Sequence, residues 1–167
     1  MKKFLAAAVA AGLVAVSAAA VIAILPAQAT TFSLRTIYVA SGVYDSGDAN
    51  GVGTATSVHC SNLSGKSATM RVSFYGAAGN FEGASNFTLT NLSTLTVSTH
   101  DTLFIESPTN TGAIFQGVLN VQSTESGVFC SAMLVDASGG SPAGMTDVPV
   151  GIALHMVRYN PHPGTVE

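Results

Sequence analysis

The stretch Thr69–Tyr75, which reads TMRVSFY, decides the fold class because apolar and polar side chains alternate along it without a break. Met70, Val72 and Phe74 point to one side of an extended strand, and the residues between them point to the other. A strand with one buried face and one wet face is typical of an antiparallel sheet.

The same period of two recurs along the chain between clusters of Gly, Asn and Ser, and no segment after residue 29 keeps an apolar stripe at helical spacing. We therefore predict an all-β domain over 30–160, a single antiparallel β-sandwich of about 8–9 strands. A C-terminal tail, 161–167, follows, because its prolines stop strand pairing. The predicted strands are Phe32–Ala40, Val52–Cys60, Met70–Phe74, Phe87–Leu89, Leu95–Val97, Leu103–Ile105, Phe115–Val121, Val128–Leu134 and Val148–Met156.

The segment 1–29 is predicted to be a secretory signal peptide. It begins with two lysines, continues with 22 uncharged residues in Phe4–Leu25, and ends in the small-x-small site Ala27–Ala29. An uncleaved anchor is the alternative, because about 20 apolar residues suffice to span a membrane. After cleavage we expect no stable membrane span. The short Met-Lys-Lys start favours a bacterial protein that is secreted or periplasmic.

The charge balance argues against a nucleic-acid partner. The 138 residues after the signal keep 4 of the 6 basic residues and all 9 acidic ones, a net charge of −5. A nucleic-acid-binding surface needs clustered Lys and Arg. Ser and Thr supply 34 of the 138 residues, and threonine suits the exposed face of a strand without adding charge.

Cys60 and Cys130 are the two cysteines of the chain, 70 residues apart in segments predicted as strands. In an oxidising compartment an even pair is expected to form one disulfide. Two small buried thiols are the alternative. A catalytic or redox role is less favoured, because there is no Cys-x-x-Cys motif and no cationic cluster nearby.

A partial resemblance to immunoglobulin-like domains is carried by the cysteine spacing, by Phe74 at the place of a core tryptophan, and by Glu125–Cys130 around the second cysteine. The resemblance implies an immunoglobulin-like architecture with a bridge between the two sheets. The sequence departs from the pattern, because Val128 replaces the expected tyrosine and no tryptophan is present. Such an architecture implies no particular function.

The loop Asp45–Gly51 is the first candidate metal site. Asp45, Asp48 and Asn50 offer oxygens at short spacings before a glycine, a pattern that can wrap calcium. An EF-hand is excluded, because Ser57 stands where its final glutamate would. The alternative, which we favour, is a turn whose Asp, Asn and Gly residues serve the backbone conformation. No other cofactor is indicated.

The second candidate metal site combines His155 and His162 with one carboxylate. The two histidines lie near the end of the predicted domain. The alternative, which we favour, is that each is solvated or hydrogen-bonded alone.

The leading functional hypothesis is an exported, non-catalytic β-sandwich module for surface recognition or assembly in the bacterial envelope or exterior. Its partner would be a glycan or a protein, since neutral hydroxylated surfaces suit hydrogen bonding better than acid–base work. Tyr38, Tyr44, Tyr75 and Tyr159 are candidate sugar platforms if several share a face, and half-buried partners across neighbouring strands are the equal alternative. Two alternatives remain: a self-associating coat or filament subunit that forms homo-oligomers through exposed edge strands, such as the one near Phe32–Ala40, and an exported hydrolase or metal-binding enzyme.

Overall fold

The computed structural model describes residues 33–48, 51–102, 107–137 and 151–159. Several predictions fall outside these ranges: the signal peptide 1–29, the strand Leu103–Ile105 and the tail 161–167. In the described residues every regular element is a strand, and no helix is long and apolar enough to span a membrane. The all-β prediction is confirmed for this part of the chain.

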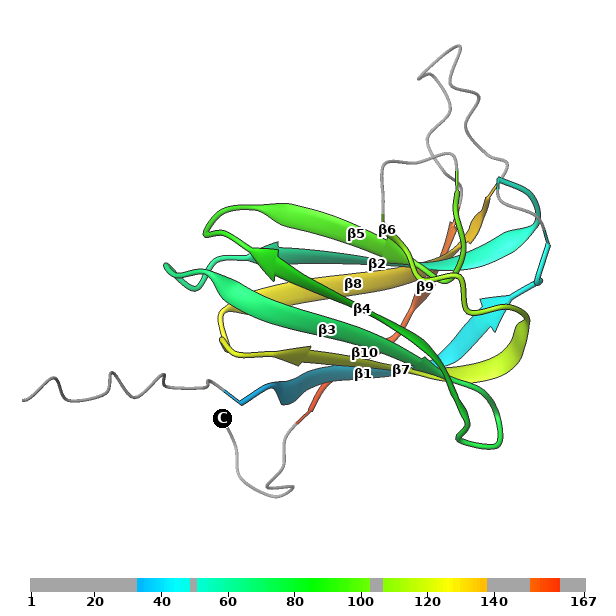
Figure 1. Cartoon of the computed structure of the whole chain (residues 1–167), viewed down its shortest axis with the longest axis horizontal. Helices are drawn as coiled ribbons and strands as arrows, with labels where there is room; N and C mark the ends of the chain where they lie inside the picture. The colour runs from blue at the N-terminus through cyan, green and yellow to red at the C-terminus, as the bar shows by residue number, and fades with distance from the viewer. Residues whose placement is uncertain (1–32, 49–50, 103–106, 138–150, 160–167) are drawn as a thin grey trace, which may run out of the picture. The chain divides into compact units, whose positions relative to one another are not determined.

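The strands form two five-stranded sheets that lie as two layers (Figure 1). All neighbouring strands are antiparallel except β5 and β6, which run parallel. Sheet A has the order β10-β1-β7-β3-β4 and sheet B the order β6-β5-β2-β8-β9. The strands are β1 (Arg35–Asp45), β2 (Thr54–Asn62), β3 (Ala68–Tyr75), β4 (Phe81–Leu89), β5 (Thr94–Ser98), β6 (Ser107–Pro108), β7 (Ile114–Ser123), β8 (Val128–Asp136), β9 (Gly151–Leu154) and β10 (Met156–Arg158).

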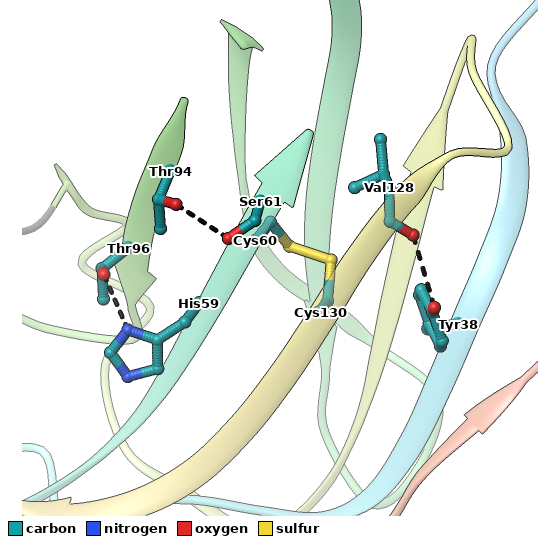
Figure 2. Close-up of a disulfide and its surroundings, with 8 residues drawn as sticks. All are labelled: Tyr38, His59, Cys60, Ser61, Thr94, Thr96, Val128 and Cys130. Atoms are coloured by element: carbon teal, nitrogen blue, oxygen red, sulfur yellow. Dashed lines mark hydrogen bonds between the residues drawn. A yellow bond between two sulfur atoms is a disulfide. The ribbon is translucent and has the colours of Figure 1, made fainter. Parts of the chain in front are cut away.

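The main core lies between the two sheets and is formed by side chains that point inward from the strands of both sheets. Met70, Val72 and Phe74 of β3 are completely buried, as their alternation predicts. Both sheets contribute, because the cluster that contains them also holds residues of β2, β5, β7 and β8. Figure 2 shows one polar link across it, where the Tyr38 hydroxyl of sheet A donates to the Val128 carbonyl of sheet B at 3.3 Å.

The predicted disulfide joins Cys60 and Cys130, which face each other on β2 and β8 with their Cα atoms 4.2 Å apart (Figure 2). Both strands belong to sheet B. The bridge therefore lies within one sheet, whereas the immunoglobulin-like resemblance implied a bridge between the sheets. Its two cysteines share the closer type of antiparallel pairing, at which side chains lie near enough to bond.

The end of the chain differs from the predicted single strand Val148–Met156. Gly151–Leu154 pairs with β8 in sheet B, and Met156–Arg158 pairs with β1 in sheet A. The chain thus passes from one sheet to the other at His155. Consequently β1 has a partner on each side at Tyr38–Ala40, so the strand predicted over Phe32–Ala40 is no exposed edge there.

Candidate functional site

A hollow is lined by residues of β1 and β7 in sheet A, by the turn after β3 and by Leu134 of β8 in sheet B. It has a volume of about 500 Å³ and lies at the end of the sheet where β1 ends and β7 begins. None of its lining residues is charged. We call it the β7 groove and define it by its lining residues: Ser41, Gly42, Val43, Tyr44, Gly76, Ala77, Phe115, Gln116, Gly117, Val118 and Leu134.

A β-bulge in β7 builds the floor of this groove. Val43 is opposite Gly117 and Asp45 is opposite Ile114, so that Phe115 and Gln116 together face the single residue Tyr44. An extra residue of this kind breaks the alternation of a strand and re-aims its side chains. Ile114 therefore turns into the core, while both bulge residues stay exposed.

The side chain of Phe115 departs from the regular alternation of the strand predicted over Phe115–Val121. In a regular strand Phe115, Gly117, Leu119 and Val121 would all lie on one face. Instead 69% of Phe115 is exposed, whereas Leu119 and Val121 are completely buried. Its ring packs edge to face against Tyr44, with the ring centres 6.0 Å apart.

A second bulge, in β4, places another aromatic pair on the same sheet. Phe74 is opposite Gly83 and Tyr75 is opposite Phe81, which leaves Glu82 as the extra residue. The rings of Tyr75 and Phe81 then pack edge to face, with their centres 5.8 Å apart. Tyr75 also lies opposite Val118, a lining residue of the β7 groove. The two aromatic pairs thus flank the start of β7 on the solvent-facing side of sheet A.

A smaller hollow of about 350 Å³ adjoins the β7 groove and shares Gly76, Ala77, Phe115 and Gln116 with it. Glu82 supplies its carboxylate, which accepts a hydrogen bond from the Asn80 amide. The exposed Phe115 therefore lines two hollows, one without charged lining residues and one with a single carboxylate.

The tyrosines predicted as sugar platforms divide into two groups. Tyr44 and Tyr75 lie on either side of β7, as described above. The hydroxyl of Tyr38 points toward sheet B, and Tyr159 lies beyond β10, with its backbone amide bound to the Ile37 carbonyl. Phe81 and Phe115 were not among the site residues predicted from the sequence. Gly83 and Gly117, which stand inside strands beside the two bulges, were the available clue, since such glycines often mark bulges.

The predicted calcium loop is organised around Asp45 and His100. Asp45 is completely buried, and its carboxylate lies 2.7 Å from His100 Nδ1 while also accepting the Gly47 amide at 2.7 Å. His100 Nε2 lies 3.1 Å from the Val52 carbonyl, to which it can only donate. This Asp–His pair ties the loop to the end of β5.

The metal predictions are not tested by the described residues. Asp48 is exposed beside Gly53, and His155 is exposed between β9 and β10. Asn50 and His162 lie outside the described ranges. Within those ranges no three His, Cys, Asp or Glu side chains gather as a metal site.

The Asp45–His100 pair also bears on the hydrolase alternative. An acid–histidine pair orients the imidazole in serine hydrolases, where the other ring nitrogen faces a nucleophile. Here that nitrogen faces the Val52 backbone carbonyl. Among the described residues the pair therefore links two loops, and its second ring nitrogen contacts a backbone carbonyl instead of a side-chain hydroxyl or thiol.

Comparisons with known proteins give one structural likeness. No family model matches the chain, and no curated protein matches it. The chain is similar to a solved structure, "Crystal Structure of Thermotoga maritima 1070", at 13% identity and a TM-score of 0.43, over 74% of this chain and 90% of that one. A likeness of this degree carries no conclusion about function.

Proposed function

We propose that the protein is an exported, non-catalytic recognition module that binds a glycan in the β7 groove. The observation that carries the proposal is the bulge in β7, which holds an exposed Phe115 ring against Tyr44 in an uncharged hollow. A mostly apolar hollow with a few polar groups, next to exposed apolar surface, is typical of a ligand-binding site.

The chemistry of the lining residues favours a sugar chain as the ligand. The C–H faces of a sugar ring pack on aromatic rings, and its hydroxyl groups need neutral donors and acceptors. The groove provides rings at Tyr44 and Phe115, an exposed amide at Gln116 and a hydroxyl at Ser41. A few polar groups in a mostly apolar hollow are what fix the orientation of a ligand.

Export is supported by the predicted signal peptide and by the cysteine pair. A disulfide between Cys60 and Cys130 persists in a secreted or periplasmic protein, whereas the reducing cytosol opposes it. The envelope and the exterior are also where glycans are abundant. The proposed place and the proposed ligand therefore agree.

The proposal is tested with Phe115→Ala on a glycan array, followed by calorimetry with the best ligand. Loss of the ring should weaken binding by about 1–3 kcal/mol, the range for truncating an aromatic residue that anchors a ligand. Phe129→Ala is the matched control, because this phenylalanine is 54% exposed on sheet B, away from the groove. Equal binding by Phe115→Ala and the native protein, or no glycan bound at all, would refute the proposal.

A second candidate function, self-association, is favoured by the edge strand β9. β9 ends sheet B within the described residues, contains no charged residue, and exposes 72% of Ile152. Natural proteins usually protect such edges with charges, because an open edge can pair with another chain.

This second candidate predicts a concentration-dependent rise in mass in sedimentation velocity. Ile152→Lys should return the protein to a monomer by placing a charge on the edge. Leu63→Lys serves as the control, since Leu63 is 55% exposed in a loop outside both sheets. A native protein that stays monomeric at high concentration would exclude this candidate.

A further inference from the structure

Arg71 is a fixed positive charge on the outer face of sheet A. It is the only basic residue in β3, β4 and β7. Its neighbours in sequence, Met70 and Val72, are completely buried, so the Arg71 side chain lies on the opposite, solvent-facing side. The mature part of the protein carries a net charge of −5, so this cation lies in a protein with more acidic than basic residues.

Two contacts hold the guanidinium group of Arg71 in place. Its Nε donates to the Ser73 hydroxyl at 3.3 Å, and its central carbon lies 5.9 Å from the centre of the Phe81 ring. Phe81 is in turn held by Tyr75. Among the described residues no carboxylate pairs with Arg71. The two terminal amino groups are therefore oriented and available as a donor fork.

Residues with amide side chains lie opposite Arg71 and Ser73 on the neighbouring strands. Arg71 lies opposite Asn86 on one side and Gln122 on the other, and Ser73 lies opposite Asn120. The Oδ1 atom of Asn120 is buried and has no hydrogen-bond partner. A buried acceptor without a donor is destabilising, and rotation of the amide would offer this oxygen to a ligand hydroxyl.

The arginine lies next to the β7 groove. The contact of its Nε with Ser73 puts the guanidinium near the facing pair Ser73 and Asn120. The next row of facing residues on the same side of β3 and β7 is Tyr75 and Val118. Rows on one face of a strand are about 7 Å apart. Because Val118 also lines the groove, one chain-like ligand can cover both features.

We propose that Arg71 is the carboxylate subsite of the glycan site, and that the ligand is an acidic polysaccharide with uronic acid residues. This inference rests on the proposed function. The sugar carboxylate accepts two hydrogen bonds from the guanidinium fork, while a neighbouring sugar ring packs on Phe115 and Tyr44. Recognition involves no covalent step.

The charge distribution favours a carboxylated sugar over a densely sulfated or phosphorylated polymer. Arg71 is one cation on a face that also carries Glu82, in a mature chain with more acidic than basic residues. A polymer of high charge density would meet repulsion from the rest of the surface. A chain that places a single carboxylate at the fork and uncharged ring faces in the groove meets none.

Calorimetry with the purified protein tests the inference, using polygalacturonate, alginate and hyaluronan as uronate probes. Arg71→Gln should weaken the best uronate at least about tenfold, because the charged hydrogen bonds are lost. Arg71→Lys should recover only part of the affinity, since a lysine keeps the charge but not the planar fork. The same polymer with its carboxyl groups reduced should bind the native protein and Arg71→Gln equally.

The outcomes separate the two proposals. If Phe115→Ala abolishes glycan binding but Arg71→Gln changes nothing, or if no uronate binds, the carboxylate subsite is wrong and the glycan groove stands. If dextran sulfate or polyglutamate binds as tightly as the uronates, the specificity for a carboxylated sugar is wrong. If no glycan of any kind binds, the proposed function itself fails. Thermal unfolding of each variant shows whether it is folded.

Discussion

At the scale of single residues, the neighbours of a polar side chain on the outer face of a sheet decide whether it is used by the fold or left available to a ligand. His59 lies on the outer face of sheet B with Nδ1 2.8 Å from the Thr96 hydroxyl, and Ser61 pairs with Thr94 in the same way (Figure 2). Arg71 lies on the outer face of sheet A and keeps its donor fork free. Both are polar residues on strands, yet the first is used by the fold and the second is available to a ligand.

The partial burial of His59 predicts a pH dependence of stability. Burial disfavours the charged imidazolium and lowers the pKa of His59 from its ordinary value of 6.5. The unfolded chain therefore binds the proton more readily, so protonation favours unfolding. The contribution of His59 is complete above pH 6.5 and is lost as the pH falls from there through the lowered pKa of the folded protein.

Urea unfolding of the native protein and His59→Gln at several pH values measures this contribution. The difference in unfolding free energy between the two proteins should change with pH below 6.5 and stay constant above it. His155→Gln, at an exposed histidine, is the control. A difference that does not vary with pH would show that His59 is equally solvated in both states.

At the scale of elements, two bulges at one end of sheet A shape the proposed binding surface. Each bulge sits beside a glycine, Gly83 or Gly117, and each presents one aromatic ring to solvent. Gly117 is constrained by close packing: an added Cβ would lie 2.7 Å from both the Tyr75 carbonyl oxygen and the Ile114 side chain. The β7 bulge therefore requires glycine at this position.

Gly117→Ala should destabilise the protein by about 1–3 kcal/mol, the usual cost of overpacking a core. It should also weaken glycan binding, because relief of the clash displaces Phe115 and Gln116. Gln116→Ala, at the exposed neighbouring position, is expected to leave stability unchanged within about 0.5 kcal/mol. Chemical denaturation and calorimetry measure both effects, and a Gly117→Ala protein of native stability would contradict this account of the bulge.

At the scale of the whole molecule, the disulfide and the sheet order connect distant parts of the chain. Cys60 and Cys130 close a loop of 70 residues that contains β3, β4, β5, β6 and β7. A crosslink of this length restricts the unfolded chain much more than the folded one. The bridge is thus expected to stabilise the molecule although it lies within one sheet.

Replacing both cysteines, as Cys60→Ala with Cys130→Ala, should reduce the free energy of unfolding by about 4 kcal/mol in the chain-entropy model. Urea denaturation of the native protein with and without reductant checks this value, since reduction should give the same loss. The double variant should not respond to reductant. Equal stability of the native and double-variant proteins would show that the bridge does not limit the unfolded chain.

Much of the fold follows from the sequence alone because the period of two is a local property. The alternation in Thr69–Tyr75 correctly predicts that Met70, Val72 and Phe74 are buried, whereas Ser73, which it places on the opposite face, is buried as well. The two cysteines in strand-like segments likewise predict the bridge. Both predictions need only the geometry of an extended chain and the difference between apolar and polar side chains.

The candidate site depends on contacts between segments that are far apart, which only the tertiary structure decides. Tyr44 meets Phe115, and Asp45 meets His100, across 55 residues or more. The bulges are a matter of register between paired strands, and each lies beside a glycine, Gly83 or Gly117, that packs closely against residues of other segments. Strand pairing also places both cysteines in one sheet, because alternation assigns a side chain to a face but does not say which strand lies beside it.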